Sequence, residues 1–441
     1  MTHLDANSAD GTEQQSQDYP RDAIIFIPGI PSDPDLYALE VVAQKFSEAL
    51  DKNSTNVQAT FKHKLEERFE SYGQNLNAKM CTIFRKEGVQ ETPVVDFYEM
   101  DYRPLLTKHY EKQNLLVKSV LVGLTLISNI PRVVLAFLRG RTSGKNLSEK
   151  LQLLYVSCIV FLLFVYIVTL LIALVQTLHG VINLNHLGQV FSSFREPVSS
   201  NQPYIATLSQ EIIVILTAIG IFTPNTKDLF NQLAISHLCL VHYLSLGSRR
   251  SVLTGQLLEL LEHILEKSET SYRHIHIVCF SFGTIISLDA LFSPLQMPLD
   301  RFQRIHTLVT IGCPFDMIRT FWPNYFSHRQ IIADAPKRWL NIYSPIDVFG
   351  SNFRNDSKIA TAEYSLSFSS ANDDATEGVS LKPENLPYLE GPNPQTISLL
   401  DWITLIGVRS HAQYWETKDE SGISCFYDLV AKLYKEDVLL K

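Results

Sequence analysis

The sequence predicts an α/β fold, in which a mostly parallel sheet is covered by helices and interrupted by a helical, membrane-embedded insertion. Two observations predict the sheet. Short apolar strands alternate with amphipathic helices along the chain, and one strand runs from Ile275 directly into Ser281 and Gly283, where a helix begins. A third observation predicts the insertion, because residues 153–175 contain no charged residue. The 441 residues are enough for one large domain of this kind and its insertion.

The amino-terminal part of the domain is predicted over residues 22–103. Residues 1–21 before it are acidic, contain neither an apolar run nor a secretory signal, and are expected to form a disordered tail. Within the domain, the apolar run at residues 23–27 predicts a strand, the pattern at residues 36–50 predicts a helix, and residues 93–98 predict another strand.

The carboxyl-terminal part of the domain is predicted over residues 236–441. Residues 250–267 place leucines at helical spacing on one face, as expected of a helix packed on the sheet. Apolar strands are expected after this helix, at residues 275–280, 307–312, 338–343 and 402–408. Strands that alternate with helices favour parallel pairing, because each parallel connection needs a crossover.

The turn from strand to helix at Ser281 is a candidate nucleophile elbow. A serine hydroxyl is a weak nucleophile unless it is held exposed beside a base, and a sharp strand-to-helix turn holds it in this way. Close packing in such a turn requires small residues two positions before and after the serine. Gly283 meets this requirement, whereas Cys279 stands where a glycine is usual. Ser281 is therefore a candidate catalytic residue, and a small residue in a crowded turn is the structural alternative.

An acid and a base for this serine follow later in the chain, each after a predicted strand. Asp347 lies in the loop after residues 338–343, and His411 lies just after residues 402–408. We expect His411 to act as the general base and Asp347 to orient it. Asp316, which follows an earlier strand, is the alternative acid. A structural explanation is also open, in which the aspartate caps its own loop and the histidine lies on the surface.

Two backbone N–H groups are expected to face the carbonyl oxygen of a substrate. One comes from the turn after the first strand, where Gly29 and Ile30 follow Pro28. The other belongs to Phe282, the residue after the candidate nucleophile. We therefore predict an oxyanion hole at Gly29, Ile30 and Phe282.

With these residues in this order, the chain resembles the α/β hydrolase superfamily, and within it the serine esterases and lipases. The resemblance extends over residues 22–103 and 236–441. It implies a sheet of the α/β hydrolase type, with the serine, histidine and aspartate above as nucleophile, base and acid. The chain departs from the family pattern at Pro28, where many members have a histidine.

The insertion between the two parts, residues 104–235, is predicted to hold two transmembrane helices. About twenty apolar residues span a bilayer core, and residues 153–175 reach this length without a charge. Residues 204–222 form the second predicted span and include Glu211, while residues 115–138 are interrupted by charges and are expected to lie at the interface. Basic residues before the first span predict an integral membrane protein with its catalytic domain on the cytoplasmic side.

Metal and nucleic-acid chemistry are not expected. His274 and His276 alternate on one strand and share a face, but no further ligand is close in sequence, so a structural role is favoured and no metal site is predicted. The net charge of -8 offers no basic surface for nucleic acid. The six cysteines show no paired spacing and predict reduced thiols. No cofactor is implied.

The predicted function is that of a membrane-anchored serine hydrolase, which cleaves a carboxylic ester or thioester through an acyl-enzyme. The predicted partners are the lipid bilayer and a lipid or other apolar ester, and the lipid inference depends on the position of the insertion. An acyltransferase with the same triad and a non-catalytic membrane adaptor on the same fold remain as alternatives. The sequence does not indicate the oligomeric state.

Overall fold

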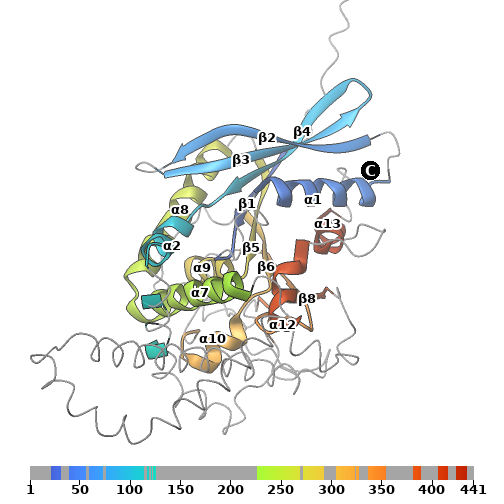
Figure 1. Ribbon diagram of the computed structural model, residues 1–441. Coiled ribbons are helices and arrows are strands. Elements are labelled where there is room, and N and C mark those ends of the chain that lie inside the picture. The colour runs from blue at the N-terminus through green and yellow to red at the C-terminus, as the bar shows by residue number, and fades with distance from the viewer. Residues whose placement is uncertain are drawn as a thin grey trace, which may run out of the picture.

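The structure is a computed structural model that describes a central sheet and the helices around it. The described residues are 21–30, 39–55, 59–72, 76–113, 117–118, 121, 123–125, 226–268, 272–292, 304–322, 324–326, 336–353, 381–388, 406–415 and 424–434. Within them, eight strands form one sheet in the order β2-β3-β4-β1-β5-β6-β7-β8 (Figure 1).

Six neighbouring strands of this sheet run parallel to one another, and one of them is β4 (Gln90–Glu99), which pairs with β1. The other five are β1 (Arg21–Ile27), β5 (Tyr272–Phe280), β6 (Ile305–Ile311), β7 (Arg338–Tyr343) and β8 (Glu384–Pro387). The first four confirm the strands predicted at residues 23–27, 275–280, 307–312 and 338–343. Their middle residues are buried, as expected of parallel strands covered on both faces, whereas the short β8 at the edge is partly exposed.

The other part of the sheet is antiparallel, so the sheet is mixed, and the prediction of a mostly parallel sheet is corrected. β2 (Ala59–Tyr72) pairs antiparallel with β3 (Leu76–Glu87), and β3 pairs antiparallel with β4 (Gln90–Glu99). A two-residue turn joins β3 to β4, and in it Gly88 has a positive φ of 60°. Such a turn reverses the chain at once, whereas a parallel pair needs a crossover of about a dozen residues or more. The strand predicted at residues 93–98 corresponds to β4.

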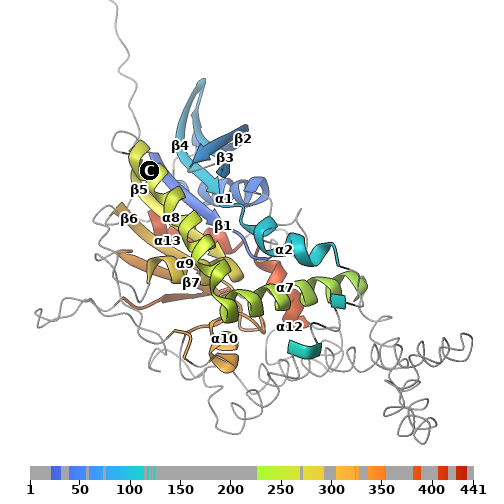
Figure 2. The same ribbon diagram turned by 90° about the vertical axis from the view of Figure 1, so that its left-hand side faces the viewer.

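Helices cover both faces of the sheet (Figures 1 and 2). One face packs against α1 (Leu39–Asn53) and α13 (Cys425–Tyr434), and the other against α7 (Thr226–Leu246), α8 (Ser248–Ser268) and α9 (Phe282–Leu291). Two further helices follow β4 and β6, namely α2 (Arg103–Glu111) and α10 (Phe315–Phe321). The helices predicted at residues 36–50 and 250–267 are confirmed by α1 and α8, although residues 36–38 lie outside the described part.

The face of α1 that meets the sheet shows why this segment is helical. Val42, Phe46 and Leu50 recur at helical spacing, and all three are fully buried. Phe46 meets the ring of Phe97 in β4 and the ring of Phe426 in α13 edge-on, with centroids 5.2 and 5.8 Å apart. These contacts join α1 to α13 over the same face of the sheet.

No membrane-spanning helix is found in the part of the chain that the structure describes. None of its helices combines the length and the apolar character that a span requires. The two predicted spans, residues 153–175 and 204–222, lie outside the described residues, as does most of the stretch at residues 115–138. The prediction of an integral membrane protein, with a membrane-embedded helical insertion and a cytoplasmic catalytic domain, is corrected accordingly. An apolar run meets the length requirement for a span but does not by itself establish one.

Where the structure describes the segment before the candidate base, it is helical, so the strand predicted at residues 402–408 is wrong at residues 406–408. α12 (Ile406–Arg409) continues into the 3₁₀ helix η3 (Ser410–Trp415), and the residues before α12 lie outside the described part. The carbonyl of Gly407 accepts a hydrogen bond from the N–H of Val348 at 3.0 Å, so α12 packs against the loop after β7. A short apolar run does not distinguish a buried strand from a buried helical turn.

Candidate active site

The chain makes a strained turn at Ser281, between the end of β5 and the start of α9. Ser281 has φ 51° and ψ -120°, backbone angles that residues other than glycine rarely adopt. Its N–H donates to the carbonyl of Ile311 in β6 at 2.9 Å, and its carbonyl accepts from the N–H of Thr284 at 3.1 Å. These bonds hold the strained residue between strand and helix. Strain of this kind is concentrated at functional sites.

Close packing around this turn explains the residues two positions on either side of Ser281. A Cβ atom at Gly283 would lie 2.3 Å from the carbonyl oxygen of Ile27, which is closer than any such contact allows. Cys279 is fully buried in the core, where its thiol donates to the carbonyl of Val309 at 3.0 Å. The turn therefore requires a glycine after the serine but accepts a cysteine before it.

Ser281, His411 and Asp347 lie far apart in the sequence but meet at the carboxyl-terminal ends of the parallel strands. The Oγ atom of Ser281 lies 2.7 Å from Nε2 of His411, and Nδ1 of the same ring lies 2.8 Å from Oδ2 of Asp347. An ionised carboxylate only accepts hydrogen bonds, so Nδ1 carries a proton. In the neutral ring Nε2 is then unprotonated and accepts a hydrogen bond from the serine hydroxyl. A general base needs this arrangement in order to take the serine proton.

The carboxylate of Asp347 is fully buried and is held by two donors besides His411. The N–H of Phe349 donates to Oδ1 at 2.8 Å, and the hydroxyl of Tyr414 donates to Oδ2 at 2.8 Å. Both oxygens are thus satisfied, as buried charged groups require. The orientation of the carboxylate is therefore set by its own loop and by η3, and not by His411 alone.

Tyr414 is a residue of this site that the sequence did not single out. Its hydroxyl accepts a hydrogen bond from the N–H of Ser344 at 2.9 Å while it donates to Asp347. Burial, and after it the neighbouring carboxylate, hold the pKa of Tyr414 well above its usual value, so the hydroxyl stays protonated and remains a donor. The sequence signal was its place three residues after His411, because residues at this spacing share one side of a 3₁₀ helix.

Aromatic side chains fix the ring of His411. Phe280, directly before the serine, stacks on it with centroids 5.2 Å apart, and Phe349 meets it edge-on, also at 5.2 Å. The side chain of His411 is 15% exposed. The ring is thus held in one orientation by packing while part of it remains accessible from solvent, which suits a preorganised site.

The predicted oxyanion loop, which holds Gly29 and Ile30, lies against the turn at Ser281. A Cβ atom at Gly29 would lie 2.9 Å from Cβ of Ser281, so the backbone of the loop passes directly beside the serine. A hydrogen bond holds the loop in place: the buried hydroxyl of Tyr102 donates to the carbonyl of Pro28 at 2.6 Å. A glycine is required at this approach, since any side chain there would displace the serine.

Phe282 carries the second predicted oxyanion donor. It is the first residue of α9, and the N–H groups in the first turn of a helix have no carbonyl within the helix to receive them. Its ring is buried against Tyr243 and Tyr102, with centroids 5.0 and 6.1 Å apart. The side chain therefore faces the core, and the start of α9 lies next to Ser281.

Asp316, the alternative acid, belongs to a different network. The hydroxyl of Ser351 donates to its Oδ2 at 2.5 Å, and Nη2 of Arg319 lies 3.5 Å from its Oδ1. The imidazole of His411 is hydrogen-bonded to Asp347 instead. Of the two candidate acids, only Asp347 is therefore in a position to orient the histidine.

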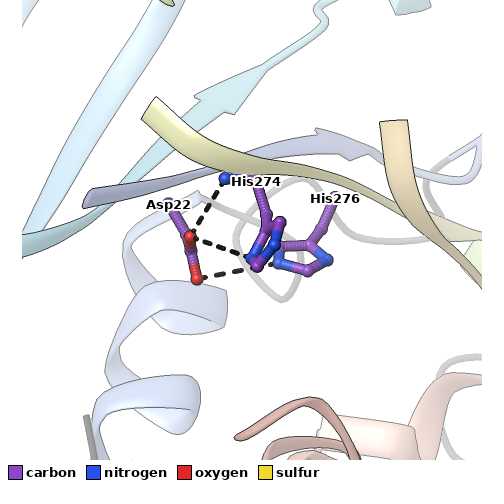
Figure 3. A group of neighbouring side chains, drawn as sticks. All are labelled: Asp22, His274 and His276. Atoms are coloured by element: carbon purple, nitrogen blue, oxygen red, sulfur yellow. Dashed lines mark hydrogen bonds and ion pairs between the residues drawn. The ribbon is translucent and has the colours of Figure 1, made fainter. Parts of the chain in front are cut away.

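A second polar cluster lies at the other end of β5, where Asp22 of β1 meets His274 and His276 (Figure 3). One ligand atom from each residue lies within 4.8 Å of the other two. No further ligand lies close to the two histidines in sequence, but the pairing of β1 with β5 brings Asp22 opposite His274. These two residues are 252 positions apart, so no spacing in the sequence signals the contact.

Comparisons with protein families, with curated proteins and with solved structures found no match to this chain. The functional conclusion therefore depends on the geometry of the site.

Proposed function

We propose that this protein is a serine hydrolase that cleaves a carboxylic ester or thioester through an acyl-enzyme. The observation that carries the proposal is the pair of contacts that joins Ser281 to His411 at 2.7 Å and His411 to Asp347 at 2.8 Å. The positive φ of Ser281 and the crowding around Gly283 add support, since both are features of a nucleophile elbow.

In the first step, Oγ of Ser281 attacks the acyl carbon while Nε2 of His411 takes the hydroxyl proton. An electron pair of the carbonyl moves to its oxygen, where the N–H groups of Ile30 and Phe282 stabilise the negative charge. His411 then gives the proton to the leaving alcohol or thiol as the C–O or C–S bond breaks. Water repeats these steps on the acyl-enzyme, which releases the carboxylic acid and restores the serine.

The remaining residues of the site hold the groups that transfer this proton in the required orientation. Asp347 holds the ring of His411 in the tautomer that accepts the serine proton, and it stabilises the imidazolium that forms. Tyr414 and the N–H of Phe349 keep the carboxylate from turning away.

The proposal is limited to the ester or thioester bond and does not extend to a lipid substrate. The lipid inference depended on a membrane-embedded insertion, for which the described residues give no support. The acyl group and the leaving group are best found with a panel of p-nitrophenyl esters and acyl thioesters of increasing chain length.

A fluorescent fluorophosphonate tests the proposal on the full chain, because this reagent modifies serines that a neighbouring base activates. We expect it to label the wild type and to leave Ser281→Ala and His411→Ala unlabelled. The matched control is Ser251→Ala, at an exposed position of α8, which should label like the wild type. Mass spectrometry of the labelled peptide should place the phosphonate on Ser281.

A folded wild-type protein that takes no label would contradict the proposal. Heat-denatured protein serves as the background, since unfolding separates Ser281 from His411. Label that persists in Ser281→Ala at the wild-type level would equally exclude Ser281 as the nucleophile.

A further inference from the structure

We propose that Asp22, His274 and His276 form a binding site for a divalent cation of the zinc type, at the amino-terminal ends of β1 and β5. The proposal is independent of the chemistry at Ser281. It is carried by the convergence of three metal-ligating side chains and by a buried histidine whose ring makes no hydrogen bond to any described residue.

The register of β1 and β5 places the three side chains on one face of the sheet. Asp22 lies opposite His274, and His276 is two residues further along β5, where side chains point to the same side. Val278, with the same orientation, packs in the core formed with α1 and α13. The cluster therefore lies on the face that these two helices cover. Figure 3 shows the carboxylate of Asp22 directed toward both imidazole rings.

Two imidazole nitrogens and a carboxylate oxygen are a donor set that Zn²⁺ prefers. Oδ1 of Asp22 lies 3.7 Å from Nδ1 of His274, and Oδ2 lies 3.8 Å from Nε2 of His276. Both distances are too long for hydrogen bonds. Two ligand atoms that each lie about 2.1 Å from one tetrahedral ion are about 3.4 Å apart. Small side-chain shifts are therefore enough to bring these atoms to the spacing of ligands that share an ion.

His276 supplies the second, independent indication of a ligand. It is only 2% exposed, and neither Nδ1 nor Nε2 makes a hydrogen bond within the described part of the chain. Buried polar side chains almost always have a hydrogen-bond partner, because the loss of solvation is otherwise not compensated. Nε2 faces the carboxylate of Asp22 across a gap that a cation would bridge. A bound cation would thus satisfy a nitrogen that makes no hydrogen bond to any described residue.

The competing explanation for the cluster is the salt bridge between Asp22 and Arg273. The guanidinium donates from Nη2 to Oδ2 at 2.9 Å and from Nε to Oδ1 at 3.2 Å. A carboxylate has about four lone-pair sites. This fork and the N–H of His274, which donates to Oδ1 at 3.2 Å, occupy three of them and leave one for a cation. Arg273 would then orient the carboxylate, as outer-shell partners of metal ligands do. The salt bridge alone does not account for the buried ring of His276 beside the same carboxylate.

The cluster is partly open to solvent at His274, whose ring is also held by a neighbouring side chain. The side chain of His274 is 37% exposed, which provides an entry path and room for water as a further ligand. His306 of β6 packs against the same ring, with centroids 4.4 Å apart, and limits its rotation. Three protein ligands with one open position are a known arrangement for zinc.

The cation would join β1 to β5 far from the candidate nucleophile. His276 precedes Ser281 by five residues, which corresponds to about 17 Å along a strand at roughly 3.3 Å per residue. A cation at this site does not reach a substrate bound at Ser281. Its expected effect is on the stability of the central strands.

Metal titration of the full chain tests the proposal. The purified protein is stripped with a chelator, dialysed and titrated with Zn²⁺ by calorimetry, and Co²⁺ reports the ligand geometry through its absorption spectrum. We expect stoichiometric binding, a tetrahedral Co²⁺ spectrum and a higher melting temperature with Zn²⁺. His276→Gln should weaken binding by more than the roughly 10- to 100-fold that loss of an outer-shell partner costs. The control His109→Gln, at an exposed position of α2, should bind like the wild type.

The proposal is overturned if the folded wild type does not bind Zn²⁺ stoichiometrically, or if His276→Gln binds as tightly as the wild type. If His276→Gln does not fold, His274→Gln decides the question, because the partly exposed ring can be replaced without opening the core. Unchanged affinity in His274→Gln would also overturn the site. Fluorophosphonate labelling of the same samples reports on Ser281 separately, so failure of one proposal is distinguishable from failure of the other.

Discussion

The two ends of strand β5 carry polar clusters that are built in different ways. At the carboxyl-terminal end, contacts of 2.7 and 2.8 Å join Ser281, His411 and Asp347 into one hydrogen-bonded chain. At the amino-terminal end, Oδ2 of Asp22 lies 3.8 Å from Nε2 of His276. Neither nitrogen of that ring has a hydrogen bond among the described residues.

The difference indicates what each cluster is suited to do. A hydrogen-bonded chain whose members are already oriented can move a proton without rearrangement. Side-chain ligand atoms that converge without hydrogen bonds between them are suited to a cation, which engages several lone pairs at once. Substitutions and chelation should therefore affect the two ends separately.

The largest effect is expected at the carboxyl-terminal end, from Asp347→Asn. An asparagine is a weaker acceptor for the N–H of His411 and can also present its own N–H, so the ring no longer keeps the tautomer that takes the serine proton. By comparison with other triad enzymes, acylation should slow about 10⁴-fold. The measurement is the rate of fluorophosphonate labelling under excess reagent.

The matched control for this variant is Asp316→Asn. It removes the same charge from a buried carboxylate, which contacts Ser351 and Arg319. This carboxylate makes no hydrogen bond to His411, which is bonded to Asp347 instead. Its labelling rate should stay close to that of the wild type. A loss in Asp316→Asn that equals the loss in Asp347→Asn would mean that the acid has been assigned to the wrong residue.

A backbone change at the same end should act through stability. In Gly283→Ala, the added methyl would lie 2.3 Å from the carbonyl oxygen of Ile27, so β1 and α9 must separate. We expect a loss of about 3 kcal/mol in the free energy of unfolding, the upper end for overpacked sites. Urea denaturation measures it.

Gly255→Ala is the comparison for this glycine. Gly255 lies in α8 with no atom within 4 Å of an added Cβ, so the change should stabilise the protein by about 0.5–1 kcal/mol. If both substitutions changed the free energy of unfolding equally, the close approach of the Ile27 carbonyl would not be the reason that position 283 requires a glycine.

A smaller effect is expected from Tyr414→Phe, which measures how much the buried hydroxyl of Tyr414 contributes to catalysis. The change removes one donor to Asp347 and leaves the N–H of Ser344 without its acceptor. We expect kcat to fall about tenfold, equivalent to about 1.4 kcal/mol, with KM unchanged. Tyr427→Phe in α13 is the control for the loss of a phenol. A rise in KM without a fall in kcat would point to substrate binding rather than to the positioning of Asp347.

The smallest effect should come from metal removal, and it tests the independence of the two ends. Sites more than about 10 Å apart without shared partners couple by only about 0.5 kcal/mol, so chelation should change the labelling rate of Ser281 by no more than about twofold. The comparison is between Zn²⁺-loaded and chelator-treated wild type at a temperature where both are folded. A loss of labelling that tracks the loss of metal would show that the ends are coupled through β5.

Local patterns were sufficient for most of the parallel part of the sheet. The strands at residues 23–27 and 338–343 are short apolar runs, and the turn at Ser281 is visible because Gly283 follows it closely. The edge hairpin was missed for a physical reason. β2 alternates apolar residues with charged ones such as Lys62 and Lys64, as exposed edge strands do, and so it contains no apolar run.

Longer-range choices were not visible in the sequence. Asp316 and Asp347 each follow a strand, and only the packing of the loop after β7 against α12 and η3 selects one of them as the partner of His411. Residues 402–408 were apolar enough for a strand, but residues 406–408, the described part of this run, form a helical turn. Such alternatives differ in tertiary contacts and not in local pattern.

By itself, the sequence determined that one strand ends in a serine turn and that an aspartate and a histidine follow in order, because these are properties of neighbouring residues. Only the tertiary structure decided that Tyr414 holds Asp347 and that Asp22 meets His274 and His276. The latter contact joins β1 to β5 across 252 positions of the chain. The register of hydrogen bonds between the strands creates it, and that register is set by the packing of the whole sheet.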